Sequence, residues 1–289
     1  AYFVSALFGY YWFKGIISFK WSKKHTFQML SFSIPLVFSS ASVFILNYFD
    51  RFMISSLLNT SALGIYSLGF KLSLVGAIAF SVFKLTTTPF IYDNYKSKDF
   101  HSRLENIFKI FLFVVITTLV FSDLFSKELI HLFADDRFDS AAPLIKYFVT
   151  SSAAFTALVF FPGMSLAKKT IPLVLIIVSA ALLNIGLNYV LISSLGFYGA
   201  ALATCSANIF MIVVHCFFSN RFFPQQMGYL VFPFLFVLIY LYSAEYYFQF
   251  IPRLNQLSIR IFLFIFLVGF SIFIIDPKIK LIKSILKIK

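Results

Sequence analysis

Long apolar runs separated by short polar segments dominate the chain. Each run has 18 or more residues, which lets a helix cross the hydrocarbon core of a bilayer, about 30 Å thick. A membrane β-barrel would instead show segments of about ten residues with alternating polarity. The pattern therefore predicts an all-α protein, a polytopic bundle of transmembrane helices. We predict nine spans, at residues 1–18, 31–58, 62–89, 107–124, 141–167, 171–195, 199–219, 229–248 and 257–275.

The polar segments between and after the runs add a few further expectations. Residues 92–106 are polar and mixed in charge, which predicts a short surface helix between the third and fourth spans. Residues 276–289 alternate Lys with Ile and Leu, which is typical of a basic cytoplasmic tail anchored at the membrane interface. The chain opens at Ala1 with an apolar run and no basic leader. We therefore expect the N-terminal part of the protein to lie upstream.

The composition agrees with a membrane protein. Hydrophobic residues make up 60% of the chain and charged residues only 12%, about half the charge of a soluble domain. The net charge of +13 would suggest nucleic acid if its positions were ignored. If the loop after the first span is cytoplasmic, 16 of the 24 basic residues lie on the inner side, together with 4 of the 11 acidic ones. This distribution follows the positive-inside rule. It predicts a multi-pass protein of the cytoplasmic (inner) membrane, with membrane lipids and no nucleic acid as partners.

Signals for catalysis are weak. The four histidines are scattered, and the chain has no paired cysteines, no His-Glu-x-x-His and no glycine-rich phosphate loop. Three carboxylates in the loop after the fourth span, Asp135, Asp136 and Asp139, match a metal or glycosyl-transfer site only loosely. An exposed acidic loop explains them better. We therefore expect no enzyme activity, no metal and no cofactor.

The informative residues are charges inside predicted spans. Asp50 and Arg51 lie about two-thirds of the way along the second span, and Lys71 lies near the middle of the third. A charge at the bilayer centre costs about 2.5 to 3.5 kcal/mol on insertion scales, and such residues usually face the bundle interior or a wet cavity. One interpretation is an Asp50–Arg51 ion pair that locks two helices, with Lys71 as a third member. The other is a cationic patch that meets an anionic substrate. Lys84 lies nearer the inner end of its span and can snorkel to the interface.

Other polar or helix-bending residues lie within the spans. Asn184 and Asn188 are spaced i, i+4, so both amides share one face of the sixth span. Hydrogen bonding between helices is their favoured role. Prolines near or inside spans can bend the helices that contain them, which suits a protein that alternates between two open states. They are Pro35, Pro89, Pro162 and Pro172.

Two stretches of the sequence resemble a known family. The first contains Ile34-Pro35, Asp50-Arg51-Phe52 and Leu63-Gly64-Ile65-Tyr66-Ser67, followed by Lys71. The second contains Ala167-Lys168-Lys169-Thr170, Asn184, Asn188-Tyr189 and the run Gly196-Phe197-Tyr198-Gly199-Ala200-Ala201-Leu202-Ala203-Thr204. Together they resemble the polysaccharide flippases of the multidrug, oligosaccharidyl-lipid and polysaccharide exporter superfamily. The branch is that of the O-antigen and capsule repeat-unit translocases.

This resemblance implies two lobes of six helices around a central cavity, with two further helices at the C-terminus. Residues 1–18 would be the last helix of the N-terminal lobe, residues 31–219 the six-helix C-terminal lobe, residues 229–275 the two additional helices, and residues 276–289 the cytoplasmic tail. The implied substrate is a lipid-linked oligosaccharide carried on an isoprenoid pyrophosphate, and proteins of polysaccharide assembly are implied as further partners.

A flippase for such a substrate needs a cationic, water-filled cavity that is open sideways to lipid. On this hypothesis Arg51 and Lys71 hold the diphosphate, Asp50 competes for them to allow release, and Lys84 belongs to the same substrate-binding set. Two alternatives stay open. A drug or cation antiporter of the same superfamily would need a titratable carboxylate at mid-depth, for which Asp50 comes nearest. A membrane-embedded polysaccharide enzyme would need a large outer loop or a His and Asp pair.

Overall fold

The computed structural model describes residues 2–15, 22–225 and 257–275, and every regular element within these ranges is helical. Five helical segments in the described ranges are long and apolar enough to cross a membrane. The predicted all-α transmembrane bundle is therefore confirmed. The elements are α1 (Tyr2–Phe13), α2 (Lys23–Leu57), α3 (Thr60–Asn94), α4 (Phe100–Leu124), α5 (Ser126–Phe133), the 3-10 turn η1 (Asp136–Ala141), α6 (Ala142–Ala157), the 3-10 turn η2 (Leu158–Phe160), α7 (Gly163–Leu166), α8 (Thr170–Leu195), α9 (Phe197–Phe222) and α11 (Leu257–Ile275).

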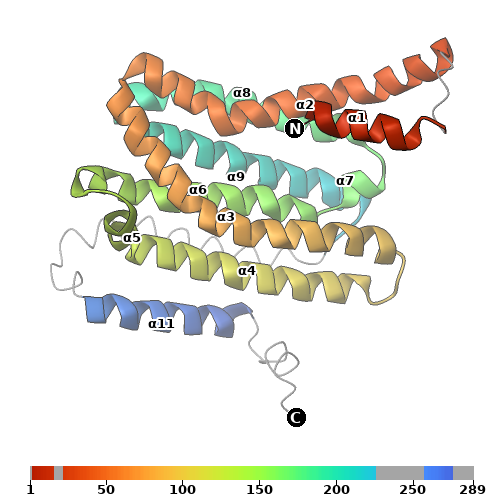
Figure 1. The fold of residues 1–289 in the computed structure, drawn as a ribbon. Helices are drawn as coiled ribbons and strands as arrows, with labels where there is room; N and C mark the ends of the chain where they lie inside the picture. Colours follow the sequence, from red (N-terminus) through yellow and green to blue (C-terminus); the bar gives the residue numbers. More distant parts are fainter. Residues whose placement is uncertain (1, 16–21, 226–256, 276–289) are drawn as a thin grey trace.

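The long helices lie side by side with their axes roughly parallel (Figure 1). Helix α6 packs against both α3 and α9, and α8 lies between α9 and α2. Helix α4 packs against α3 and α6 on one side and against α11 on the other. This order brings the C-terminal half of α2 against α8, α9 and α3, where it forms the candidate site described below.

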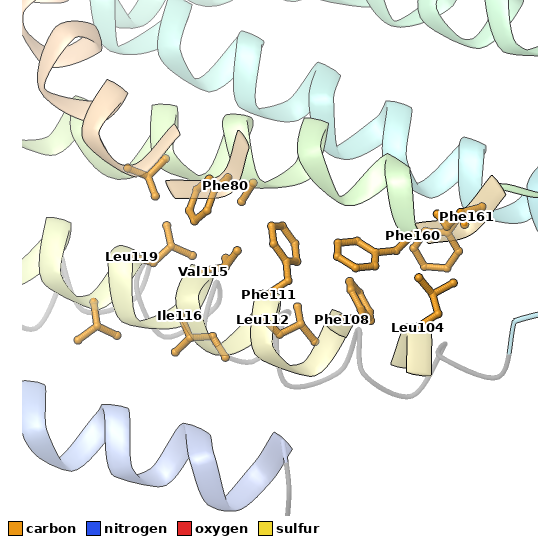
Figure 2. Close-up of a cluster of buried hydrophobic side chains, with 14 of the residues drawn as sticks. Phe80, Leu104, Phe108, Phe111, Leu112, Val115, Ile116, Leu119, Phe160 and Phe161 are labelled. Carbon is orange, nitrogen blue, oxygen red and sulfur yellow. The ribbon is translucent and has the colours of Figure 1, made fainter. Parts of the chain in front are cut away.

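Phenylalanine rings fill the core between α3, α4 and the end of α6 (Figure 2). The rings of Phe108 and Phe111 lie with their centroids 4.8 and 5.1 Å from that of Phe160. Phe80 on α3 meets Phe111 edge to face at 5.9 Å. Each such ring buries about 150 to 250 Å². Some of the many phenylalanines of this chain therefore pack between helices and not against lipid.

Small residues let α3 approach its neighbours closely. Gly69, Ser73 and Gly76 are buried along one face of α3. A Cβ added to Gly69 would lie 3.0 Å from the Cβ of Leu144 on α6, and one added to Gly76 would lie 2.8 Å from Cγ2 of Thr118 on α4. Small residues at such crossings are typical of membrane helix packing. The spacing of these residues thus fixes where α3 crosses its neighbours.

The fifth predicted span is not one continuous helix, which corrects the sequence prediction. The helix ends before Pro162, which has no N–H to continue the hydrogen-bonding pattern. The freed carbonyl of Phe161 accepts a hydrogen bond from Ser219 Oγ at 2.6 Å and lies 2.9 Å from Nε2 of His215, both on α9. Gly163 follows, where an added Cβ would lie only 2.1 Å from the carbonyl oxygen of Ser219. The break therefore docks onto the C-terminal end of α9.

The surface helix predicted for residues 92–106 is also absent from the described structure. Helix α3 continues to Asn94 and α4 already begins at Phe100, with a turn closed by a 2.8 Å hydrogen bond from Ser97 N to Asn94 O. The polar residues after the turn form the first turns of α4. Leu104 is fully buried there. The polar stretch is the amphipathic start of a long helix.

Two contacts place later parts of the chain at opposite ends of α4. His101 Nδ1 lies 3.2 Å from Oε1 of Gln225, so the segment after α9 meets the start of α4. Arg260 donates a 3.1 Å hydrogen bond to the carbonyl of Leu124, so the start of α11 meets the end of α4. The chain therefore passes from one end of α4 to the other between Gln225 and Arg260, as the span predicted at 229–248 would require. That span itself lies outside the described residues.

The predicted lobe boundaries stay predictions. The residues of α1 described from Val4 onward are exposed, except that Gly9 is partly buried. The tail at 276–289 lies outside the described residues, as does the end of the first predicted span at 16–18.

Candidate functional site

Asp50 lies in a buried polar junction between three helices. Its side chain is 2% exposed on α2. The hydroxyl of Tyr66 on α3 donates a short hydrogen bond to Asp50 Oδ2, and Thr204 Oγ1 on α9 lies 3.4 Å from the same oxygen. The backbone N–H of Arg51 donates to Asp50 Oδ1 at 2.7 Å. The carboxylate is thus satisfied by neutral donors.

Two asparagines of α8 extend this junction. Asn188 Nδ2 donates to Asn184 Oδ1 at 3.1 Å, and Asn184 Nδ2 donates to Thr204 Oγ1 at 3.1 Å. The hydroxyl of Thr204 is then free to point its proton at Asp50, so the hydrogen bonds run in one direction and end on the carboxylate. Aligned chains of this kind polarise and strengthen one another in a low-dielectric interior. The predicted hydrogen bonding of Asn184 between helices is confirmed.

A tight turn between α8 and α9 sets Thr204 opposite Asn184. Gly196 has a φ of +61°, a backbone conformation that glycine adopts without strain. A Cβ added to Gly199 would lie 2.0 Å from the carbonyl oxygen of Leu191. Because only glycine allows this approach, the two helices begin in close contact and place their polar residues at matching depths.

Arg51 faces away from the buried carboxylate. Its guanidinium carbon lies 4.2 Å from the ring centroid of Phe70 on α3 and 5.0 Å from that of Tyr48 on α2. One guanidinium nitrogen, Nη1, reaches the carbonyl of Asn47 at 3.4 Å. Among the described residues no ion pair joins Arg51 to Asp50. The ion pair considered from the sequence is replaced by a hydrogen-bonded carboxylate and a stacked arginine on different faces of α2.

The two lysines predicted for the site are exposed. Lys71 directly follows Phe70, the ring on which Arg51 stacks, and it has no ion pair or hydrogen bond with another described residue. Lys84 lies 13 residues, between three and four turns, further along α3, with its Nζ 5.3 Å from the ring centroid of Phe155 on α6. The structure therefore places Arg51 against Phe70, the residue that precedes Lys71, and it gives Lys84 a separate contact.

Sequence reasoning did not assign a role to Tyr66, Thr204, Tyr48 or Phe70. Tyr66 and Thr204 were noticed only as members of the family motifs. Tyrosine is common in this chain, with 15 occurrences, so no single one stands out. A usable signal was the position of Tyr66 on the same helix face as Gly69 and Ser73, which marks it as buried.

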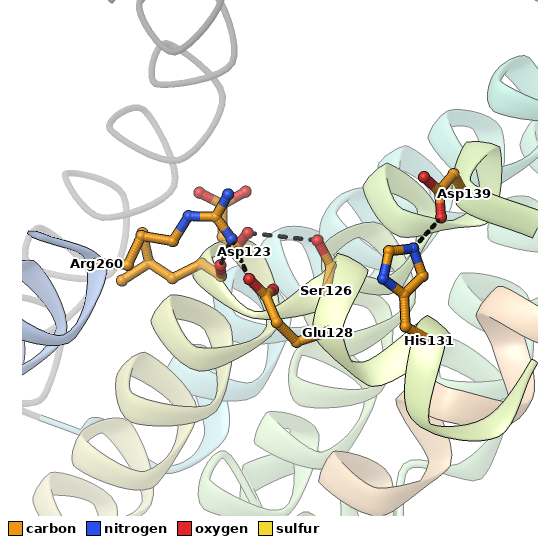
Figure 3. Close-up of polar contacts among 7 residues, drawn as sticks. Asp123, Ser126, Glu128, His131, Asp139 and Arg260 are labelled. Carbon is orange, nitrogen blue, oxygen red and sulfur yellow. Dashed lines mark hydrogen bonds and ion pairs between the residues drawn. The ribbon is translucent and has the colours of Figure 1, made fainter. Parts of the chain in front are cut away.

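The outer acidic loop forms local contacts (Figure 3). His131 Nε2 lies 2.8 Å from Asp139 Oδ1 and 3.5 Å from Asp136 Oδ1. Within the described part of the chain, no group of three or more His, Cys, Asp or Glu is arranged to hold a metal ion. Arg260 of α11 pairs with Glu128 at 2.5 Å, so charged residues at this end tie α11 to the start of α5.

A buried ion pair joins two core helices near the same end. Lys146 on α6 is 3% exposed and pairs with Asp123 on α4 at 3.1 Å. Leaving either partner alone would bury an uncompensated charge, which is strongly unfavourable. This pair therefore requires the end of α4 and the start of α6 to stay together.

Comparison with known proteins supports the family resemblance. Residues 1–94 match the family described as "Polysaccharide biosynthesis protein". A stretch of 107 residues is 30% identical to "Lsg locus putative protein 1" of Haemophilus influenzae (strain ATCC 51907 / DSM 11121 / KW20 / Rd), covering 36% of this chain and 27% of that protein. The match thus spans little more than a quarter of that relative. These similarities confirm the predicted likeness to polysaccharide biosynthesis proteins, and all four predicted site residues fall within the matched 1–94.

Proposed function

We propose that the protein flips isoprenoid-pyrophosphate-linked oligosaccharide repeat units across the cytoplasmic membrane for surface polysaccharide synthesis. The observation that carries this proposal is the stacked guanidinium of Arg51. Its guanidinium carbon lies over the rings of both Tyr48 and Phe70, and Nη1 reaches the carbonyl of Asn47, so the group is held in position by three contacts. A guanidinium fixed in this way presents its N–H edge for bidentate contacts with phosphate oxygens.

The surroundings of Arg51 favour an anion as its partner. The neighbouring carboxylate of Asp50 accepts hydrogen bonds from Tyr66 and Thr204 and forms no ion pair with Arg51, so it does not occupy the N–H groups of the guanidinium. Lys71 adds an exposed positive charge just beyond Phe70. A diphosphate headgroup would supply the missing negative charge, while its isoprenoid tail stayed in lipid. No covalent step is needed for this movement.

In the proposed cycle Asp50 has a different role from the one first considered. It does not compete with the substrate for Arg51, because its hydrogen bonds hold it toward α3 and α9, about 100° around α2 from Arg51. Instead it fixes the rotation of α2 relative to α3 and α9, which keeps Arg51 turned outward from the helix junction. Alternating access would then carry the bound headgroup past a rigid C-terminal lobe.

The test is the replacement of Arg51 in the full-length protein, with Arg221 as a matched control. Arg221 is also stacked, 4.7 Å from the ring centroid of Phe217, but it lies at the end of α9. We expect Arg51→Ala to abolish surface polysaccharide and to accumulate lipid-linked repeat units inside the cell, at normal protein levels. Arg221→Ala should keep export. Normal export by Arg51→Ala would refute the proposed anion site.

The antiporter alternative makes a different prediction. It would require Asp50→Asn to abolish ion-dependent efflux of a cationic dye by the full-length protein, with Arg51→Ala still active. The antiporter alternative would be excluded if polysaccharide export depended on Arg51 and the full-length protein showed no dye efflux.

A further inference from the structure

The exposed face of α2 carries aromatic rings in line with Arg51. Phe44, Tyr48 and Arg51 follow one another at intervals of about one turn, so they lie on one side of the helix. Leu46, Asp50 and Ile54, spaced i, i+4 and i+8, lie on a different side of the helix and are buried against the bundle. The exposed side is thus separated from the core of the lobe.

This face is unsuited to lipid. The guanidinium of Arg51 points back along α2 to the carbonyl of Asn47, away from the outer end of the helix. It therefore does not snorkel to the membrane interface. The hydroxyl of Tyr48 has no hydrogen-bonding partner among the described residues, although the side chain is 48% exposed. A lone charge and an unpaired hydroxyl at this depth are costly in hydrocarbon and are tolerated where water or a ligand reaches them.

The rings form a continuous platform beside the charge. The centroids of Phe44 and Tyr48 are 5.1 Å apart with an interplanar angle of 34°. The Tyr48 ring in turn lies 5.0 Å from the guanidinium carbon of Arg51. Seven residues separate Phe44 from Arg51, which is about 10 Å along a helix. The platform is therefore as long as a phosphate group followed by one or two sugar rings.

We infer that Phe44 and Tyr48 form a sugar-binding subsite, on which the pyranose rings next to the pyrophosphate stack while Arg51 holds the phosphate. This inference rests on the proposed function and adds the part of the substrate that each residue contacts. A pyranose has apolar C–H faces that pack on aromatic rings and hydroxyls at its edge, which the Tyr48 hydroxyl can reach. Stacking of this kind depends little on which hydroxyls are present, so the subsite accepts a class of sugars.

The test compares two probes on the purified full-length protein. Farnesyl pyrophosphate carries the anion alone, and farnesyl pyrophosphate linked to N-acetylglucosamine carries the anion and a sugar. We expect the wild type to bind the sugar probe more tightly. Phe44→Leu keeps the apolar volume but removes the ring, and it should weaken the sugar probe about fivefold, the scale of one aromatic contact, with the affinity for farnesyl pyrophosphate unchanged. Phe38→Leu, at an equally exposed ring on another side of α2, should change neither.

The outcomes separate this inference from the proposed function. Equal binding of the two probes by the wild type, or no selective loss in Phe44→Leu, would overturn the sugar subsite. Tyr48→Leu should also weaken the sugar probe, and Tyr48→Phe should restore most of the loss because it keeps the ring. Arg51→Ala should weaken both probes. If it weakens neither, the anion site fails, whatever the ring variants show.

Discussion

At the scale of single residues, two adjacent positions on α2 have separate tasks. Asp50 is buried and ties α2 to α3 and α9 through Tyr66 and Thr204, whereas Arg51 lies on the other side and stacks on Phe70. Consecutive helix residues are about 100° apart, so a charged pair in the sequence need not be an ion pair in space. The buried carboxylate and the stacked guanidinium are thus neighbours in the sequence that form no ion pair.

Loss of the Tyr66 hydroxyl should destabilise the protein while leaving the positive charge of Arg51 in place. Tyr66→Phe leaves the buried Asp50 carboxylate without its shortest hydrogen bond. A buried acceptor that loses its donor costs about 1 to 3 kcal/mol. We expect a lower thermal unfolding temperature in detergent for the full-length protein. Tyr48→Phe is the control, because its hydroxyl has no hydrogen-bonding partner among the described residues, and it should unfold at the wild-type temperature. Equal unfolding temperatures for both variants would contradict the role of the junction.

Sequence patterns identified the charges of the site but not their partners. Asp50 and Arg51 stand out because charged residues are rare in a run as apolar as the second span. The partners are a tyrosine and a threonine, which are ordinary in membrane helices and carry no such contrast. Which of the two charges is buried depends on the rotation of α2 against α8 and α9, and that rotation is set by packing across distant parts of the chain.

At the scale of helices, the apolar runs predicted which parts of the chain form helices better than where each helix begins and ends. The predicted span at 257–275 has the bounds of α11, and that at 171–195 differs from α8 by one residue. Helix α2 begins eight residues before its predicted span, at Lys23. The first turns of such helices are polar, so a search for continuous apolar residues omits them. Pro162 indicated a bend in the fifth span, but the full break before α7 could not be predicted, because it depends on a carbonyl that α9 satisfies.

That break depends on the absence of a side chain at Gly163. A Cβ there would meet the backbone carbonyl of Ser219, which cannot move aside as a flexible side chain can. We expect Gly163→Ala to destabilise the full-length protein by about 1 to 3 kcal/mol through overpacking. Gly186→Ala provides the control, because an added Cβ meets nothing within 4 Å on α8, and alanine favours a helix. Thermal unfolding in detergent measures both, and a wild-type unfolding temperature for Gly163→Ala would show that α7 can separate from α9.

At the scale of the whole molecule, the charged residues of the loops and the arrangement of the helices agree on one orientation in the membrane. The connection between α3 and α4 and the region of α7 lie at one end of the bundle, and α5 lies at the other (Figure 1). The basic loops of the sequence fall at the first end, and most acidic loop residues, including Asp136 and Asp139, fall at the second. The positive-inside rule then assigns the first end to the cytoplasm.

This orientation is testable with two introduced cysteines in the full-length protein. Asp136 has a side chain that is 92% exposed in the acidic loop, and Lys168 is exposed between α7 and α8. With the native Cys205 and Cys216 replaced by serine, Asp136→Cys should react with a membrane-impermeant maleimide in intact cells. Lys168→Cys should react only after the membrane is permeabilised. The reverse pattern would invert the bundle, and Arg51 would then lie nearer the cytoplasmic surface, where it would meet the headgroup before translocation and not partway across.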